Sequence, residues 1–306
     1  MMREGSMSQP AAPRRVGIHL PTAGGVCRAP ERAHVIGANT FQIFSSSPRM
    51  WRGSVIAPAY RDRMTELRSL YDCSPLVIHA SYLINLCSQS DPVRANSIKA
   101  LRGEIERALA LNAEYLVLHP GSWKGLTREE GLRLAVESVA RALDGLPWAK
   151  TPFTILIENT AGAEFSLGAS LQQVAELIAR LHAIVPVAAC LDTCHTHVAG
   201  YDIVSPKGYQ ATVRQIEQLL GLKTVKVWHV NDAKTPRGSH LDRHQHIGEG
   251  TLGIAPFRRL LNDPRFAHSA FIAETPVDQS DDDLRNVSVL RSLIARSSSM
   301  ASYNRE

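Results

Sequence analysis

The sequence lacks the features that would place the chain in a membrane or in an oxidising compartment. No stretch of the 306 residues approaches ~18 consecutive apolar residues, the length that a helix needs to cross a bilayer. The first residues, MMREGSMSQPAAPRR, contain no apolar run of the kind found in signal peptides. The five cysteines are odd in number and show no short paired spacing, which argues against a disulfide scaffold. These absences predict a cytoplasmic protein.

Strong charge of one sign is also missing. Lys and Arg total 34 and Asp and Glu total 29, so the net charge of +5 permits a polyanionic partner without requiring one. Hydrophobic residues make up 44% of the chain, which is typical of a globular protein with a large core. No linker or low-complexity segment divides the sequence. We therefore expect one domain over residues 15–296, a disordered leader at 1–14 and a flexible tail at 297–306.

The sequence does contain a regular alternation of short apolar runs and helix-like stretches. Each run is almost entirely apolar, as strands buried on both faces should be. The eight runs are VGIHL (16–20), TFQIF (40–44), PLVIHA (75–80), EYLVLHP (114–120), FTILIEN (153–159), AACLDT (188–193), VKVWHVND (225–232) and AFIAET (270–275). Eight strand–helix repeats predict an α/β fold, the (β/α)₈ TIM barrel. A doubly wound open sheet is the alternative, but polar residues at the ends of nearly all runs favour the closed barrel.

Three of the intervening stretches carry helix signals. Residues 91–113 begin with an Asp cap and a Pro in the first turn, followed by apolar residues at helical spacing. Residues 127–146 open on a Thr with Glu three residues later, the pattern of a capping box. Residues 170–181 show a third helical pattern. Such helices would connect neighbouring strands and cover the outside of the barrel.

Ionisable side chains gather where the predicted strands end. Nine residues of metal-ligating types lie at or after the ends of the third to eighth strands: His79, His119, Glu158, Asp192, His195, His229, Asp242, His244 and Glu274. The carboxyl ends of barrel strands meet at one face, where barrel enzymes build their sites. A single histidine in a strand is more often a hydrogen-bonded core residue, but nine such residues at one face are hard to explain in that way.

The residue types in this group favour divalent metal ions. Four carboxylates brought together without cations would repel one another and lose their hydration. Mixed imidazole and carboxylate ligands suit Zn²⁺, and Mn²⁺ or Fe²⁺ is also compatible with one or more sites. Nine ligands exceed what one tetrahedral ion uses, so two or three ions are expected. Cys190 and Cys194, in the same part of the sequence, are interpreted as residues that fill space.

Six short motifs follow one another along the chain. They are HASYLINL, LHPGS, IENTAG, LDTCHTHVAGYD, HVNDAK and DRHQHIGEG, and together they resemble the endonuclease IV family of abasic-site (AP) endonucleases over about residues 16–295. The resemblance implies a barrel with three zinc ions that hydrolyses the phosphodiester 5′ to an abasic site, leaves a 3′-OH and also trims 3′-blocked ends. It further implies that the protein binds double-stranded DNA, with no organic cofactor and no membrane, and that it is associated with the nucleoid if the source is bacterial. We expect a monomer, because a DNA-binding face must stay exposed.

Carried over position by position, the resemblance distributes the nine residues among three ions. The three sets would be His79, His119 and Glu158; Glu158, Asp192, His229 and Glu274; and His195, Asp242 and His244. Glu158 would bridge the first two ions. It would also be the catalytic residue, because it would orient the attacking water and accept its proton.

The resemblance also assigns residues to DNA binding. Arg49 in PRMW, with Tyr82 and Leu83 in SYL, matches the loops that the family inserts into the base stack. A planar guanidinium and an aromatic ring can replace the stacking that is lost when a nucleotide flips out, and an abasic site is the least costly nucleotide to flip. Three positions depart from the family pattern: the serines at 45–47 replace Lys-Asn-like residues, Pro21 replaces Ser, and His240 replaces a basic residue. These departures concern DNA affinity and damage range rather than the metal ligands.

Two other functions fit part of the pattern. A metal-dependent sugar isomerase or epimerase can use the same barrel, and it would account for Glu158, Asp192, His229 and Glu274. It has no need for the Asp-x-His pair at 242 and 244. A DNA-binding protein that uses metals only for stability is the non-enzymatic alternative. An inactive nuclease would be expected to lose a ligand, however, and all nine positions keep theirs.

Overall fold

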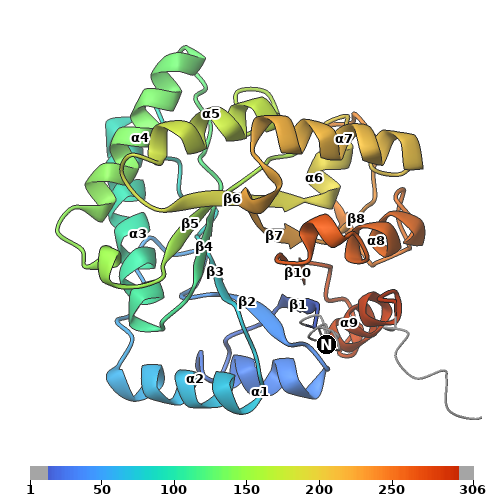
Figure 1. Ribbon diagram of the computed structural model, residues 1–306. Coiled ribbons are helices and arrows are strands. Elements are labelled where there is room, and N and C mark those ends of the chain that lie inside the picture. The colour runs from blue at the N-terminus through green and yellow to red at the C-terminus, as the bar shows by residue number, and fades with distance from the viewer. Residues whose placement is uncertain (1–12, 296–306) are drawn as a thin grey trace, which may run out of the picture.

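The strands close into a barrel with helices around it. The computed structural model describes residues 13–295, so most of the predicted leader and all of the predicted tail lie outside the described residues. The barrel has the strand order β1-β10-β7-β6-β5-β4-β3-β2, and every neighbouring pair is parallel (Figure 1). Its strands are β1 (Arg15–His19), β2 (Thr40–Phe44), β3 (Leu76–His79), β4 (Tyr115–Leu118), β5 (Thr154–Glu158), β6 (Val187–Asp192), β7 (Val225–His229) and β10 (Ala270–Ala273). The prediction of a TIM barrel is confirmed.

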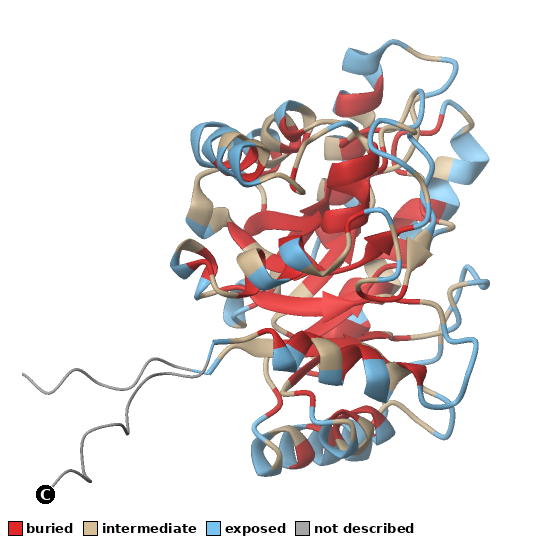
Figure 2. Ribbon diagram, turned by 90° about the vertical axis from the view of Figure 1, so that its right-hand side faces the viewer, coloured by how far each residue is buried: buried red, intermediate tan, exposed pale blue. Residues whose placement is uncertain are grey.

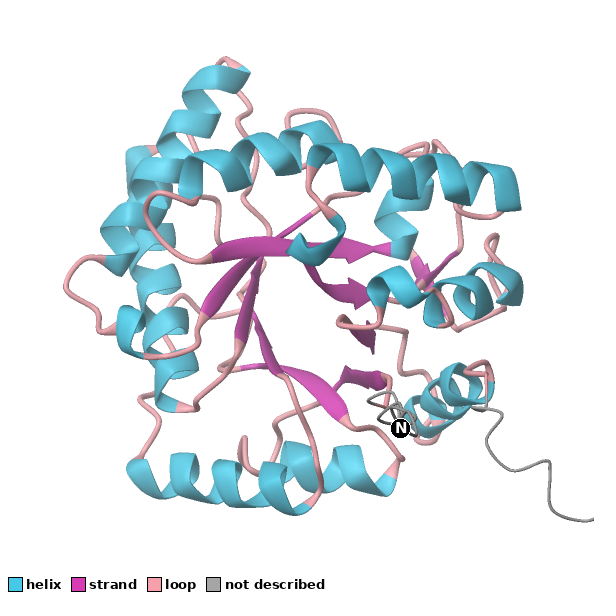
Figure 3. Cartoon of the chain, in the orientation of Figure 1, coloured by secondary structure: helices cyan, strands magenta, loops and turns pink. Residues whose placement is uncertain are grey.

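Helices surround the strands (Figure 3). They are α1 (Arg28–Val35), α2 (Pro58–Leu70), α3 (Asp91–Ala110), α4 (Arg128–Leu143), α5 (Leu171–Leu181), α6 (Thr193–Val198), α7 (Pro206–Leu219), α8 (Ile254–Leu261) and α9 (Asp282–Ser292). The capping box before α4 is confirmed, since the Thr127 hydroxyl accepts from Glu130 N and the Glu130 side chain accepts from Thr127 N. The predicted Asp91 cap is wrong. Ser90 holds the N-cap position, without a side-chain cap hydrogen bond, and Asp91 is the first residue of α3, where its negative charge suits the amino-terminal end of a helix.

The core has two layers. Inside the barrel lies a cluster of buried side chains made of Val77, Val117, Leu156, Ala188, Cys190, Val227, Ala270 and Ile272. A larger layer, which includes Cys194, fills the space between strands and helices, and Figure 2 shows the buried strands at the centre of the molecule. Full burial of one such aliphatic side chain contributes about 1.5–3 kcal/mol. The interior cluster fills the barrel below the carboxyl ends of the strands, so the polar side chains at those ends pack on a layer of buried apolar side chains.

The chain between β7 and α8 contains a small hairpin that the sequence did not reveal. Strands β8 (Asp232–Ala233) and β9 (His244–Gln245) pair antiparallel, and the residues between them form the hairpin loop. The predicted strand 225–232 therefore ends at His229, and the chain leaves the barrel there. Within residues 13–295, no helix is both long and apolar enough to cross a bilayer.

Candidate metal centre

The nine predicted ligand residues meet at the carboxyl ends of the strands. Four of them are the last residues of their strands: His79, Glu158, Asp192 and His229. His119 and Glu274 directly follow β4 and β10. The remaining three come from α6 and from the β8–β9 hairpin: His195, Asp242 and His244. The parallel strands thus bring together side chains that are up to 195 residues apart, from His79 to Glu274.

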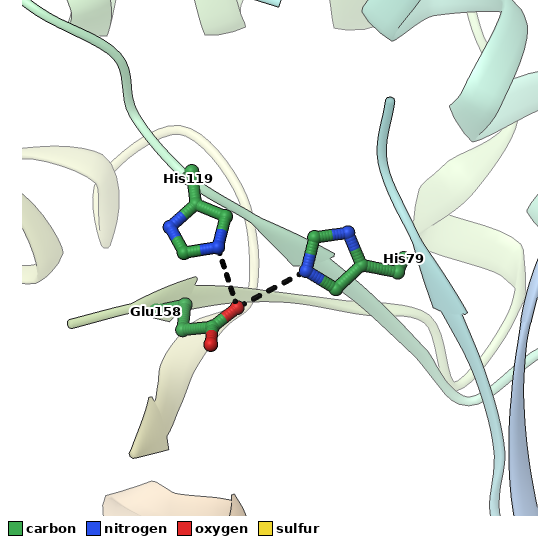
Figure 4. A group of neighbouring side chains, drawn as sticks. All are labelled: His79, His119 and Glu158. Carbon is green, nitrogen blue, oxygen red and sulfur yellow. Dashed lines mark hydrogen bonds and ion pairs between the residues drawn. The ribbon is translucent and has the colours of Figure 1, made fainter. Parts of the chain in front are cut away.

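Glu158 lies at the centre of the site and is fully buried. Its Oε2 lies 3.1 Å from Nε2 of His79 and 3.1 Å from Nε2 of His119 (Figure 4). Its other oxygen, Oε1, lies 2.9 Å from Nδ1 of His229. One carboxylate therefore faces histidines on two sides, an arrangement suited to a ligand that bridges two cations. We call His79, His119 and Glu158 the first group.

The second group consists of Glu158, Asp192, His229 and Glu274. One ligand atom from each of these residues lies within 4.8 Å of the others. Nδ1 of His229 lies 3.2 Å from Oε2 of Glu274. Because three of the four residues are carboxylates in a buried site, the group needs positive charge to be stable.

The third group, His195, Asp242 and His244, depends on a loop as well as on α6. Oxygens of Asp242 lie 3.2 Å from Nε2 of His195 and 3.2 Å from Nε2 of His244. The Asp242 side chain is 54% exposed, unlike the buried carboxylates of the second group. Nε2 of His244 is buried and makes no well-aligned hydrogen bond among the described residues, although an oxygen of Asp242 lies 3.2 Å away. A buried nitrogen without a well-aligned hydrogen bond is a natural metal ligand, since a cation would satisfy its lone pair.

Hydrogen bonds to backbone carbonyls fix the ring orientation of three of the histidines. Nδ1 of His79 donates to the carbonyl of Ala80 at 2.7 Å, and Nδ1 of His195 donates to that of Asn159 at 2.9 Å. Nδ1 of His244 donates to the carbonyl of Glu274 at 2.9 Å. These bonds fix Nδ1 as the donor and direct Nε2 into the site, so that Nε2 is the nitrogen available to a metal ion.

Three amide side chains support the site, and reasoning from the sequence missed them. Gln42 accepts from Nε2 of His229 at 2.8 Å and donates to Glu274 at 2.5 Å. Asn231 donates to Asp192 at 2.5 Å, and Asn159 accepts from the backbone N–H of Asp192 at 2.8 Å. Gln42 had a signal in the sequence, because it is a polar residue in the middle of the otherwise apolar run TFQIF.

Proton affinity in the site is strongly perturbed. Burial alone would lower the pKa of His195 and of His229. Asp192, Asp242 and Glu158 raise the pKa of His195 well above its usual value, and Cys190, Glu274 and Glu158 do the same for His229. Burial would likewise lower the pKa of His244, yet Asp192 and Asp242 raise it to about 9. Burial would raise the pKa of Glu274, and His229 lowers it to about 2. The carboxylates stay ionised and draw cations, either protons on the imidazoles or metal ions.

The predicted DNA-binding residues lie on two adjacent loops at the same face. Arg49 follows β2 and is exposed, and Tyr82 follows β3 with 59% of its surface exposed. Leu83 beside it is half-buried. The hydroxyl of Ser81 donates to the carbonyl of Pro48 at 2.8 Å and so ties the two loops together. An exposed aromatic ring on a fixed loop beside a polar site is well placed to contact a ligand.

Two of the positions that depart from the family pattern, Ser45 and His240, take part in local contacts. Ser45 turns inward, where its hydroxyl donates to Glu104 at 2.5 Å and accepts from Nε of Arg107 at 2.7 Å. It therefore anchors the loop and is not available to a phosphate. His240 adopts a left-handed conformation with φ of 57°, and its Nδ1 lies 3.3 Å from the carbonyl of Ala161. His246, in the motif DRHQHIGEG, is buried, and its Nδ1 accepts from the side-chain amide of Asn286 at 3.0 Å.

Comparisons with known proteins agree with this architecture. Residues 30–293 match the family model described as xylose isomerase-like TIM barrel. A protein of Solibacter usitatus (strain Ellin6076) named probable endonuclease 4 is 49% identical over 282 residues, which cover 91% of this chain and 96% of the relative. The crystal structure of endonuclease IV from Thermus thermophilus is 36% identical, with a TM-score of 0.80 over 91% of this chain and 98% of that one. A D-tagatose 3-epimerase-like protein, 18% identical with a TM-score of 0.65 over 91% of this chain and 96% of that one, shares the fold alone.

High identity to the first of these relatives extends over nearly the whole length of both chains, so the likeness goes beyond the barrel itself. The chain belongs to the endonuclease IV family, within the xylose isomerase-like TIM barrels.

Proposed function

We propose that the protein is a DNA repair endonuclease that hydrolyses the phosphodiester 5′ to abasic sites and leaves a 3′-OH. We also propose that it trims 3′-blocked ends. The observation that carries the proposal is the meeting of nine His, Asp and Glu side chains at one face of the barrel, in a chain of the endonuclease IV family. The proposed partner is double-stranded DNA, bound by one copy of the chain without an organic cofactor.

The three groups of side chains fit three divalent ions, which we propose to be zinc. The donors are imidazole nitrogens and carboxylate oxygens, the ligand types that zinc uses, and Nε2 of His244, which makes no well-aligned hydrogen bond among the described residues, supports a cation in the third group. When bound, the ions would supply Lewis-acid stabilisation of the negative charge that develops on the phosphate. Mn²⁺ or Fe²⁺ is compatible with the same donors.

Glu158 is the residue that we propose to orient and deprotonate the attacking water. Burial would raise the pKa of this carboxyl, but His119 and His229 hold it well below its usual range, so the carboxylate is ionised. His79 and His119 hold Oε2, and His229 holds Oε1. The carboxylate therefore has a fixed orientation, which a general base requires.

Arg49, Tyr82 and Leu83 are proposed to enter the base stack of the DNA. Their loops stand at the same face as the ligand groups, and Ser81 holds the two loops together. An aromatic ring and a guanidinium could occupy the gap that a flipped nucleotide leaves, and an abasic nucleotide has no base to unstack. Because the Ser45 side chain turns inward, DNA affinity would rely on these three side chains rather than on Ser45.

The test is incision of a duplex oligonucleotide with one central abasic analogue, compared with an intact duplex. Metal-loaded wild-type protein should cut on the 5′ side of the lesion, and prolonged chelation should abolish the cut. Glu158→Gln should reduce incision by at least about 10³-fold, or about 4 kcal/mol. Glu137→Gln, on the exposed face of α4, is the matched control and should cut normally.

Absence of cleavage by fully metal-loaded protein would refute the nuclease proposal. Isomerisation of free and phosphorylated sugars should then be measured, since sugar-converting proteins share this barrel. An activity as a sugar isomerase or epimerase requires only the second group, however, and it gives no role to Asp242, His244 or the exposed Tyr82.

A further inference from the structure

One buried carboxylate beside the site is not among the nine ligand residues. Asp232 is the first residue of β8, three positions after His229, and it is fully inaccessible to solvent. A buried charge is costly unless it is compensated. Its hydrogen-bond partners within the described residues are all backbone N–H groups.

Five backbone N–H groups donate to this one side chain. Oδ1 accepts from Ala233 at 2.8 Å and from Leu252 at 2.9 Å. Oδ2 accepts from Gly248 at 3.0 Å, Gly250 at 3.0 Å and Gly253 at 3.2 Å. Four of the five donors thus come from the segment 248–253, which folds around the carboxylate. Hydrogen bonds to an ionised acceptor are about twice as strong as neutral ones, so the segment is held firmly.

The glycines of the segment make this wrapping possible. A Cβ at Gly250 would lie 2.4 Å from the carbonyl oxygen of Ala233 and 2.4 Å from Oδ1 of Asp232. Gly248 has a φ of +86°, a conformation that other residues rarely adopt. The sequence GEGTLG at 248–253 is therefore the sequence of a loop closed around a carboxylate.

The wrapped carboxylate lies at the base of the hairpin that carries the third group. Asp232 pairs with Gln245 and Ala233 with His244 in the β8–β9 ladder. Thr251, inside the wrapped segment, donates its N–H to the carbonyl of Ala233 at 2.8 Å and its hydroxyl to the carbonyl of Thr235 at 2.8 Å. β8 and the residues that follow it are thereby held against the segment that Asp232 organises, and β9 is held through its pairing with β8.

We propose that Asp232 is a positioning residue for the third metal ion. It fixes the base of the hairpin so that Asp242 and His244 reach His195, the only member of the third group that lies on a helix. The first and second groups have no residue on the hairpin, so they do not depend on Asp232. This inference rests on the proposed metal-dependent function.

The experiment counts zinc ions per chain in Asp232→Asn. The asparagine side chain has the same size, but its NH₂ group replaces one carboxylate oxygen. That NH₂ group would face the backbone N–H groups that donate to Asp232, and it cannot accept their hydrogen bonds. Each protein is loaded with zinc, separated from free metal and analysed for metal content, and zinc is then withdrawn by a graded series of chelators. We expect one ion to bind about 10–100-fold more weakly than in wild type, with the others unchanged.

Two further variants make the result specific. Gly250→Ala leaves every carboxylate in place but intrudes on the wrapped segment, so it should weaken the same ion and provides a second route if Asp232→Asn does not fold. Asp263→Asn is the matched control, because Asp263 is also a buried carboxylate that accepts a backbone N–H, from Arg265 at 3.0 Å, but lies far from the hairpin in the fold. It should retain every ion.

Equal zinc content and equal affinity in wild type, Asp232→Asn and Gly250→Ala would overturn the inference while leaving the proposed function intact. Loss of all ions together in either variant would also overturn it, since the role would then not be confined to the third group. A wild-type chain that takes up no divalent ion would refute the proposed function itself, and this inference with it.

Discussion

At the amino-terminal end of the barrel, buried or half-buried carboxylates meet arginines, whereas at the carboxyl-terminal end they meet histidines. Glu114, just before β4, accepts two hydrogen bonds from Arg68, at 2.5 and 2.7 Å, and one from the N–H of Leu76 at 2.8 Å. Asp263 at the same end bonds to Arg265, and although burial would raise its pKa, Arg265 and Tyr209 lower it. These pairs are complete without any added ion.

Arginine keeps its charge at every accessible pH, but histidine near neutrality does not. The pairs at the amino-terminal end are therefore permanent and serve stability. The four carboxylates at the other end, among them the fully buried Glu158 and Asp192, find no arginine or lysine within ion-pair distance in residues 13–295. Their charge is balanced only while the imidazoles hold protons or another cation is bound. The amino-terminal end of the barrel therefore contributes to stability, whereas the carboxyl-terminal end is suited to binding cations.

Metal removal should have the largest effect on stability. An ion present at a thousand times its Kd adds about 4 kcal/mol to the free energy of unfolding, and each kcal/mol shifts the Tm of a chain of this size by roughly 2 °C. Loss of a single ion should therefore lower the Tm by about 8 °C, which calorimetry before and after chelation can measure. Re-addition of zinc should restore it. A Tm that does not change on chelation would contradict the prediction. It would mean that the carboxylates at the carboxyl-terminal end of the barrel, like those at the amino-terminal end, need no metal ion for stability.

The barrel and the position of the site followed from the sequence. The eight apolar runs lie within two residues of the observed strands at most of their ends, because strands buried on both faces need nearly continuous apolar sequence. Parallel strands share one carboxyl end, so residues such as His79 and Glu274 could be expected to meet there although their sequence separation is large.

The supporting residues did not follow from the sequence, because their roles arise only from contacts across the fold. Gln42 bonds to His229 from a position 187 residues away, and no local pattern indicates that partner. Asp232 stands in the motif HVNDAK, but its five backbone donors become visible only when the segment 248–253 closes around it. The antiparallel pairing of β8 and β9 is too short to leave a strand signal.

Glu114→Gln at the amino-terminal end should have an intermediate effect. The change removes the charge that meets Arg68, and because the pair is partly exposed we expect a loss of about 2 kcal/mol of unfolding free energy. Urea denaturation measures the loss, which should be the same with and without bound zinc. Incision of abasic DNA per folded molecule should match wild type. A change in zinc content would show that the two ends are coupled.

The smallest effect concerns pH, and its sign should differ between metal-loaded and metal-free protein. The pKa of His244 is raised to about 9 in the metal-free fold, against about 6.5 in an unfolded chain. A raised pKa stabilises the fold fully below the unfolded value, and the stabilisation is lost as the pH rises through the folded value. Metal-free protein should therefore lose roughly 1.5–2 kcal/mol between about pH 6.5 and 8.5.

Metal-loaded protein should not lose stability over this range, because ions compete with protons for the imidazoles and bind more tightly as the pH rises. Urea midpoints of both forms at the two pH values give the comparison. Buried cysteines such as Cys87, whose pKa burial raises to about 12, titrate alike in both forms and cancel in the difference. The arginine pairs do not titrate in this window, so any divergence arises at the histidine end. Equal urea midpoints for metal-free protein at both pH values would contradict this prediction. They would mean that His244 takes up no additional proton on folding.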